Sequence, residues 1–213
     1  MHSLELWLVR HARPLVAAGT CYGRLDVAAD PEHTQASAQA LSSALRAAGP
    51  VMTPEPWLVW SSPLARALSL AQALLNCAPA AVALHPCKVD QRLAEMDFGT
   101  WEGQRWQDIP RGALEAWTDD FHHHRPGGGD NVAGFLTRVR DALDDCAREV
   151  HARRARGAIW FTHAGVIRAV EVWLAGLPQP LQARDWPQKT CDFGEWNIQV
   201  LKTSPSGLII GTR

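Results

Sequence analysis

Histidine and arginine side chains follow several apolar stretches of the sequence. Arg10 and His11 come directly after one stretch, His163 after another, and Arg66 shortly after a third. Guanidinium groups bind phosphoryl oxygens in a bidentate way and keep their charge near neutral pH. A neutral imidazole can attack phosphorus, and a second histidine can stabilise charge on the transferring group. If these segments meet, they predict a phosphoryl-transfer site that requires no metal.

A phosphoryl-transfer site also needs a proton donor for the departing alkoxide, and a carboxylic acid can supply that proton. Glu95 and Asp97 lie in a stretch without helix or strand periodicity, and Glu102 follows them. Spacing alone does not choose among these three carboxylates.

Short apolar runs beside turn residues predict the strands that must position these groups. The expected strands are Leu4–Val9, Trp57–Trp60, Ala81–His85 and Ala158–Thr162, with closing strands at Cys191–Val200 and Leu208–Ile210. In open α/β sheets, ligands bind at the carboxyl ends of the strands. His11 and His163 both stand at such ends.

Helical patterns alternate with these strands. They cover Pro63–Asn76, Val132–Val150 and a segment from about Gly165 to Gly176, and the composition of Ala36–Ala48 favours a further helix. Ser62 is the expected N-cap of the first of these helices, with Pro63 at its first position, and Asp130 is a candidate cap for the long helix. The alternation predicts an α/β fold whose sheet is covered on both faces.

The overall composition excludes several classes of protein. The 213 residues carry a formal net charge of −1, and 46% of them are hydrophobic and 20% charged, which argues against a disordered chain or a membrane bundle. Without a positive field, we expect no nucleic-acid partner. The first apolar stretch is broken by Glu5 and stops at Arg10, so it is too short for a signal peptide or membrane span.

The cysteines and the linker pattern bear on location and organisation. Five widely spaced cysteines without a Cys-x-x-Cys pair predict free thiols in a reducing cytoplasm. Gly127–Gly129 precedes a helix rather than joining two domains, so residues 1–213 are predicted to form a single domain. A homodimer is compatible with the sequence.

Four ordered segments, VRHARP, SSPLARAL, RLAEMDFGTWEG and THAGVIR, resemble the histidine phosphatase superfamily, also called phosphoglycerate mutase-like. The resemblance implies a three-layer α/β/α sandwich with a mainly parallel sheet and a metal-independent phosphomonoesterase without a cofactor. The site residues that it implies are His11 as the nucleophile, Arg10 and Arg66 as phosphate clamps, Glu95 as the proton donor and base, and His163 as the second pocket histidine.

Two further segments narrow the resemblance. Cys21–Asp26 and Glu95–Gly103 look most like bacterial alpha-ribazole phosphatases of cobalamin biosynthesis, which implies alpha-ribazole 5′-phosphate as the small-molecule substrate. The short segment between Glu95 and His163 favours a phosphatase over a mutase, with a pocket-covering insertion around residues 100–130. The alternatives are a phosphoglycerate mutase, a broad-specificity sugar-phosphate phosphatase, and a catalytically silent protein that binds a phospho-ligand.

Tryptophan is unusually frequent, with ten Trp against one Tyr and five Phe. Those in predicted strands and on a helix stripe are expected to be packing residues, namely Trp7, Trp57, Trp60, Trp160 and Trp173. Trp101, Trp106 and Trp117 follow Glu95, where one of them could stack on the benzimidazole of a ribazole group. The candidate substrate contacts are Trp101 and Arg24, although Arg24 could equally form an ordinary ion pair.

The three adjacent histidines His122–His124 are potential metal ligands by residue type. Adjacent histidines cannot all face one ion from a regular element, and no nearby Cys or His completes a ligand spacing. We expect a solvated loop there and no metal site in the chain.

Overall fold

The computed structural model describes residues 2–48, 55–79, 82–177, 179–204 and 207–208. These residues form a six-stranded sheet in the order β3-β2-β4-β1-β5-β6. The strands are β1 (His2–Arg10), β2 (Trp57–Ser61), β3 (Lys88–Val89), β4 (Gly157–Thr162), β5 (Trp196–Ser204) and β6 (Gly207–Leu208). The first four strands pair in parallel, and β5 and β6 are antiparallel. The sheet is therefore mainly parallel, as predicted.

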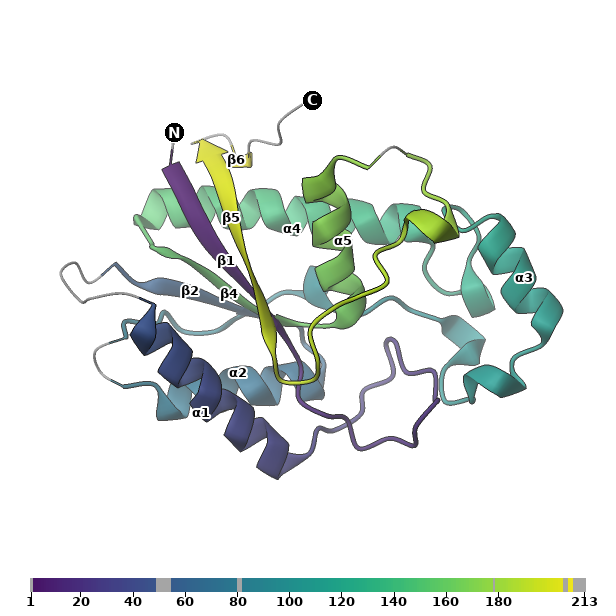
Figure 1. The fold of residues 1–213 in the computed structure, drawn as a ribbon, viewed down its shortest axis with the longest axis horizontal. Coiled ribbons are helices and arrows are strands. Elements are labelled where there is room, and N and C mark those ends of the chain that lie inside the picture. Colours follow the sequence, from purple (N-terminus) through teal and green to yellow (C-terminus); the bar gives the residue numbers. More distant parts are fainter. Residues whose placement is uncertain (1, 49–54, 80–81, 178, 205–206, 209–213) are drawn as a thin grey trace.

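Helices cover both faces of the sheet (Figure 1). The α-helices are α1 (Pro31–Ala47), α2 (Ala65–Cys77), α3 (Arg111–Asp119), α4 (Val132–Arg153) and α5 (Ala164–Ala175). Along β1, Leu6 and Leu8 face α4 and α5, whereas Trp7 and Val9 face α1 and α2. This alternation is the period of two that a strand buried on both faces shows. The predicted three-layer α/β/α sandwich is confirmed.

Large aromatic side chains fill both layers of the core. Trp60 and Trp160 stack between neighbouring strands, with ring centroids 6.1 Å apart, and Trp7 contacts the Trp57 ring edge-on at 5.7 Å. The exposed fraction of each of these four side chains is 3% or less. Their predicted role in packing is confirmed.

One predicted helix start and two predicted caps were wrong, whereas the predicted start of the long helix at Val132 is confirmed. The helix after β2 begins at Ala65 with Leu64 as its N-cap, not at Pro63 with Ser62 as its cap. The Ser62 N–H donates to the carbonyl of Phe161, so this residue still belongs to the sheet edge and the helix starts later. The long helix is capped by Asn131, whose Oδ1 accepts from the Gly134 N–H at 2.9 Å, and not by Asp130.

The predicted strand at Ala81–His85 is also wrong for the residues that the structure describes there. Leu84 makes only an isolated bridge to Trp57, and the edge strand lies later, at Lys88–Val89. Pro86 lacks the N–H that would continue the ladder from His85. At the other edge, β5 begins at Trp196 rather than Cys191, and part of the predicted strand at Leu208–Ile210 lies outside the described residues.

Residues 99–131 lie beyond the carboxyl ends of β1, β2 and β4, at the right of Figure 1. Two glycines hold this segment together at its base. A Cβ on Gly99 would lie 2.1 Å from the Gly127 carbonyl oxygen, and one on Gly127 would lie 2.1 Å from that of Phe98. Both glycines have positive φ values, of 55° and 59°. Glycine is therefore required at both positions, where the backbone at residues 98–101 lies against the backbone at residues 127–129.

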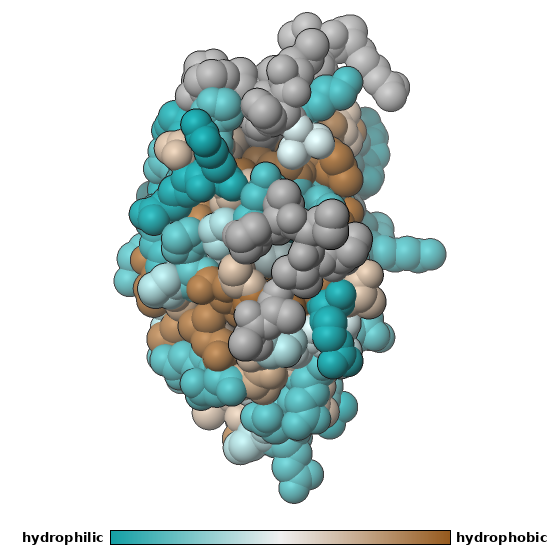
Figure 2. Space-filling view, turned by 90° about the vertical axis from the view of Figure 1, so that its left-hand side faces the viewer, coloured by the Kyte–Doolittle hydropathy of each residue, from teal (hydrophilic) through white to brown (hydrophobic). Residues whose placement is uncertain are grey.

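The side of the molecule in Figure 2 is mostly hydrophilic, with hydrophobic residues in separate groups. All five cysteines are free, as predicted. Among the described residues, no helix is both long enough and apolar enough to cross a membrane.

Candidate active site

Two histidines meet at the carboxyl ends of adjacent strands. Strands β1 and β4 are parallel and place Arg10 opposite Thr162, so the next residues along each chain, His11 and His163, lie side by side. Their ring centroids are 5.1 Å apart, and the His11 N–H donates to the Thr162 carbonyl at 2.9 Å. The exposed fractions of His11 and His163 are 3% and 0%. The pairing of the strands thus brings the two predicted histidines together.

His11 is held in one orientation and kept neutral. Its Nδ1 lies 2.7 Å from the Ala12 carbonyl oxygen, which can only accept, so Nδ1 carries the hydrogen and Nε2 keeps its lone pair. Burial lowers the pKa of His11 to about 3, and the positive charges of Arg66 and Arg10 act in the same direction. At neutral pH the imidazole is therefore uncharged, with Nε2 as its nucleophilic atom.

His163 is neutral for the same physical reasons. Burial lowers its pKa well below the ordinary value, and the charge of Arg66 adds to the effect. Its Nε2 is hydrogen-bonded to Ser62 Oγ at 2.8 Å, while Nδ1 has no partner among the described residues. Ser62 therefore fixes the ring of the second histidine.

Arg66 is fully buried and is held by a loop of the main chain. Its Nη1 donates to the Leu25 carbonyl at 2.9 Å, and its Nη2 donates to the carbonyls of Gly23 at 2.7 Å and Tyr22 at 3.2 Å. The Tyr22 ring lies 5.3 Å from the guanidinium carbon. The Nε–H finds no partner in the described part of the chain. The charge of Glu95 acts on this buried cation, but no carboxylate among the described residues forms an ion pair with it, and a phosphate would form one.

Arg10 is anchored in a similar way by the segment that precedes β5. Its Nη1 donates to the Cys191 carbonyl at 3.0 Å, and its guanidinium carbon lies 4.0 Å from the centre of the Phe193 ring. The Nε–H is buried and likewise unpaired within the described residues. Both arginines are thus oriented by carbonyl groups and aromatic rings, and each retains an unpaired donor.

A cavity of about 140 Å³ opens beside these groups. Its lining residues are Arg10, His11, Thr20, Tyr22, Gly23, Glu95, Phe98, Trp106 and Ala164. Arg66 and His163 lie behind that lining, in contact with Tyr22 and His11 respectively. Three of the predicted site residues therefore line the cavity, and the other two contact its lining residues.

Glu95 is the carboxylate that faces the cavity. Its Oε2 accepts from the Gly165 N–H at 3.0 Å, at the beginning of α5, and its Oε1 accepts from the Met96 N–H at 3.0 Å. Asp97 is used in a local turn, where its Oδ1 accepts from the Gly99 N–H. Of the three carboxylates that spacing left open, only Glu95 is among the residues lining the cavity.

Glu102 organises the loop that holds Arg66. Its Oε1 accepts from the N–H groups of Arg24 at 2.7 Å and Phe98 at 2.9 Å, and its Oε2 accepts from the Leu25 N–H. The N–H groups of this loop therefore bind Glu102, while its carbonyls bind Arg66. The sequence predicted no such role, because bonds from a side chain to a distant backbone leave no periodic signal.

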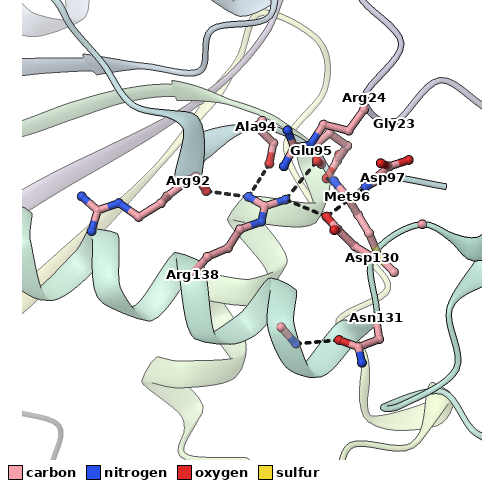
Figure 3. A network of polar contacts seen from close by, with 12 residues as sticks. Gly23, Arg24, Arg92, Ala94, Glu95, Met96, Asp97, Asp130, Asn131 and Arg138 are labelled. Carbon is pink, nitrogen blue, oxygen red and sulfur yellow. Dashed lines mark hydrogen bonds and ion pairs between the residues drawn. The ribbon is translucent and has the colours of Figure 1, made fainter. Parts of the chain in front are cut away.

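Arg138 performs a similar task for Glu95 (Figure 3). From α4, its Nη1 donates to the carbonyls of Arg92 at 2.6 Å and Ala94 at 2.7 Å, and its Nη2 donates to the Glu95 carbonyl at 3.0 Å. Asp130 Oδ2 lies 3.5 Å from the same Nη2 and accepts from the Asp97 N–H at 3.2 Å. The Arg138 side chain is only 18% exposed.

The two candidate substrate contacts do not line the cavity. Trp101 is 7% exposed and packs with Cys21 and Ile109, whereas Trp106 supplies the tryptophan in the lining. Arg24 is half-buried beside Gly23 and Glu95 in Figure 3, and its Nε–H has no partner among the residues that the structure describes. Of the predicted tryptophans, Trp106 is therefore the one placed to touch a ligand in this cavity.

The three adjacent histidines lie in a turn after α3. His122 Nδ1 accepts from the Leu181 N–H at 3.3 Å, and the His122 and His123 rings meet edge to face. Within the described ranges, no group of three or more His, Cys, Asp or Glu side chains is arranged to hold a metal ion.

Known proteins resemble this chain in sequence and in fold. The model of the histidine phosphatase superfamily (branch 1) matches residues 6–199. A glucosyl-3-phosphoglycerate phosphatase of Mycolicibacterium vanbaalenii is 28% identical over 195 residues, which cover 88% of this chain and 79% of that protein. The adenosylcobalamin/alpha-ribazole phosphatase of Escherichia coli is 28% identical over 96 residues, 44% of this chain and 46% of that protein. The crystal structure of the alpha-ribazole phosphatase from Shigella flexneri has the same fold, with a TM-score of 0.73 at 23% identity over 98% of this chain and 95% of that one.

Proposed function

Because the chain belongs to the histidine phosphatase superfamily and is a phosphatase, we propose that His11 Nε2 carries the phosphoryl group between a small phosphate monoester and water. One observation carries the proposal. The imidazole is buried, neutral and fixed through Nδ1, so its Nε2 lone pair is available beside two arginines. A nucleophile in this state needs no separate base to activate it.

The first step transfers the phosphoryl group to the enzyme. The Nε2 lone pair of His11 forms a bond to phosphorus while the ester P–O bond breaks, and the departing alkoxide takes a proton from the carboxylic acid of Glu95. Arg10, Arg66 and His163 stabilise the charge on the phosphoryl oxygens. This role of Glu95 is supported by its place in the lining of the same cavity as His11.

The second step returns the enzyme to its starting state. The Glu95 carboxylate accepts a proton from water, the water oxygen bonds to phosphorus, and the P–Nε2 bond breaks to release inorganic phosphate and neutral His11. The segment around residues 100–130 covers the pocket and limits which esters reach it. We further propose a cytoplasmic, single-domain enzyme that requires no metal and has no nucleic-acid or membrane partner, with a homodimer as one compatible assembly.

Alpha-ribazole 5′-phosphate is the leading substrate of the proposal, which would place the enzyme in cobalamin biosynthesis. Support comes from the likeness to the Escherichia coli alpha-ribazole phosphatase and from Trp106 in the cavity lining. Glucosyl-3-phosphoglycerate is the second candidate, because the relative that acts on it matches more of the chain.

Rates of phosphate release on three esters test this proposal. We expect kcat/KM to be highest on alpha-ribazole 5′-phosphate, lower on glucosyl-3-phosphoglycerate and lowest on 3-phosphoglycerate, with no isomerised phosphoglycerate formed. A higher value on glucosyl-3-phosphoglycerate would move the assignment to the second candidate. Isomerisation without phosphate release would indicate a mutase, and tight binding without turnover of any ester would indicate a silent binding protein.

A further inference from the structure

A second cavity, of about 270 Å³, adjoins the cavity of about 140 Å³ beside His11. The two cavities share Glu95, Phe98 and Trp106 in their linings. The other residues that line the second cavity are Met96, Trp117, Phe121, Val132, Phe135, Gly165, Arg168 and Trp186. Glu95, the proposed proton donor, thus stands between the site of phosphoryl transfer and a largely aromatic chamber.

The aromatic walls form a connected series of flat surfaces. The rings of Trp106 and Trp117 are nearly parallel, 13° apart in plane, and Phe98 meets both of them edge-on at 5.3 and 5.9 Å. Beyond Trp117 the series continues to Phe121 at 5.6 Å and from there to Trp186 at 5.7 Å. Flat aromatic walls favour a planar ligand, which stacks on them or meets their edges.

Two polar groups in this lining lack partners. The indole N–H of Trp117 and the Nε–H of Arg168 are buried without a hydrogen-bond acceptor among the described residues. Within the described ranges, the Arg168 side chain makes one hydrogen bond, from Nη2 to the Gln188 carbonyl at 3.2 Å. A buried donor without a partner is rare and costs free energy, so a ligand that brings an acceptor into the cavity gains by satisfying it.

We propose that this cavity binds the leaving group of the phosphate ester, and that the group is a planar aromatic ring with at least one hydrogen-bond acceptor, such as the base of a nucleoside. The inference rests on the proposed phosphatase reaction at His11. With phosphorus at His11, the ester oxygen faces Glu95 and the rest of the alcohol extends past Trp106. A polyhydroxylated group, in contrast, would lose water against apolar walls that offer its hydroxyls few partners.

Two matched esters test the proposal, because they differ only in the ring. Ribose 5-phosphate and benzimidazole riboside 5′-phosphate share the same primary alcohol, so the chemistry at Glu95 is the same for both. We expect kcat/KM to be at least about tenfold higher for the benzimidazole ester, because its ring would fill the apolar cavity and ribose alone would not. In Trp117→Leu that preference should largely disappear. Trp117→Phe should retain part of it, because the ring stays and the N–H is lost.

Trp173→Leu is the matched control. Trp173 is also a half-buried tryptophan, but its N–H already donates to the Leu136 carbonyl at 2.9 Å and it lines neither cavity. This variant should keep the preference for the benzimidazole ester. Thermal unfolding of each variant shows whether it is folded.

Calorimetric titration with benzimidazole riboside, which has no phosphate, separates this inference from the proposed reaction. Binding to the wild type that weakens about tenfold in Trp117→Leu supports the cavity assignment even if neither ester is hydrolysed, in which case only the proposed reaction fails. Equal kcat/KM on the two esters, a preference unchanged in Trp117→Leu, or no binding of the riboside to the wild type would overturn it. The aromatic cluster would then be packing of the 99–131 segment alone.

Discussion

Arg138 Nη2 donates to the backbone carbonyl of Glu95 at 3.0 Å, so a residue of α4 holds the main chain of the proposed acid rather than its carboxylate. The carboxylate itself accepts from two backbone N–H groups, those of Met96 and Gly165. The position of Glu95 is therefore set by α4 on one side and by the beginning of α5 on the other. Small displacements of either helix should therefore move the Glu95 carboxylate relative to the leaving group.

Replacing Arg138 should impair proton donation more than phosphate binding. In Arg138→Met we expect kcat on an alkyl phosphate to fall by about a hundredfold, because a displacement of about 1 Å at a catalytic group has that effect. The rate on 4-nitrophenyl phosphate, whose leaving group needs no proton, should fall much less. Arg140→Met on the same helix, where Arg140 pairs with Asp144, is the control. Equal losses on both esters would show that Arg138 does not act through Glu95.

A methyl group at Gly165 should displace the Glu95 carboxylate directly. A Cβ there would lie 2.2 Å from Oε1 of Glu95, whereas a Cβ on Gly112 in α3 has no heavy atom within 4 Å. Gly165→Ala should therefore lose most activity on alkyl phosphates while the protein still folds. Gly112→Ala should keep full activity and unfold at the same or a slightly higher temperature, since alanine favours helix. Full activity in Gly165→Ala would show that the Glu95 carboxylate does not act from its position against the start of α5.

The loop that holds Arg66 should loosen when Glu102 loses its charge. Glu102→Gln keeps one carbonyl oxygen but replaces the other acceptor with an NH2 group facing backbone donors. We expect the inhibition constant of inorganic phosphate to rise about tenfold, which corresponds to about 1.4 kcal/mol. Glu115→Gln, on the exposed side of α3, should leave it unchanged. An unchanged constant in both variants would show that the loop does not depend on Glu102.

The stability of the unliganded protein should fall as the pH is lowered from about 6.5. His11 has an ordinary pKa of 6.5 when unfolded and a pKa of about 3 when folded. Between these values only the unfolded chain binds the proton, so lowering the pH favours unfolding by about 1.4 kcal/mol per pH unit for this residue. Burial acts on His163 in the same direction.

Urea unfolding at pH 7, 6 and 5 checks this dependence. The free energy of unfolding of the wild type should decrease more steeply than that of His11→Asn over this range. Carboxyl groups titrate in both proteins, so the difference between the two slopes isolates His11. Parallel slopes would mean that His11 is not kept neutral by burial.

Much of the fold followed from local pattern, because apolar periodicity directly reflects burial. The predicted order of strands and helices matched wherever one face or both faces of an element are buried, as in β1 and α4. The exceptions are the edge strand, the first turn of α2, and α3, a helix without a buried residue that the pattern did not predict. Leu84 lies in an apolar run typical of a strand, but it makes only an isolated bridge to Trp57. Ser62 was the expected helix cap, but its N–H donates to the Phe161 carbonyl of β4.

Part of the site could be predicted from the sequence. His11 and His163 stand directly at strand ends, so topology alone brings them together. Arg138 and Glu102 act through the backbone of segments far away in sequence, and Trp117 lines a cavity to which residues 95–98, α4 and α5 also contribute. Such contacts depend on three-dimensional packing, which no local period encodes.

Trapping a phosphohistidine tests most directly whether His11 carries the phosphoryl group. The enzyme is mixed briefly with a radiolabelled phosphate ester and quenched in alkali, in which phosphohistidine survives, and the labelled peptide is then identified by mass spectrometry. We predict label on the peptide that contains His11, appearing and decaying at rates no slower than turnover, and none in His11→Ala. Turnover without any label on His11, or an active His11→Ala enzyme, would contradict this role of His11.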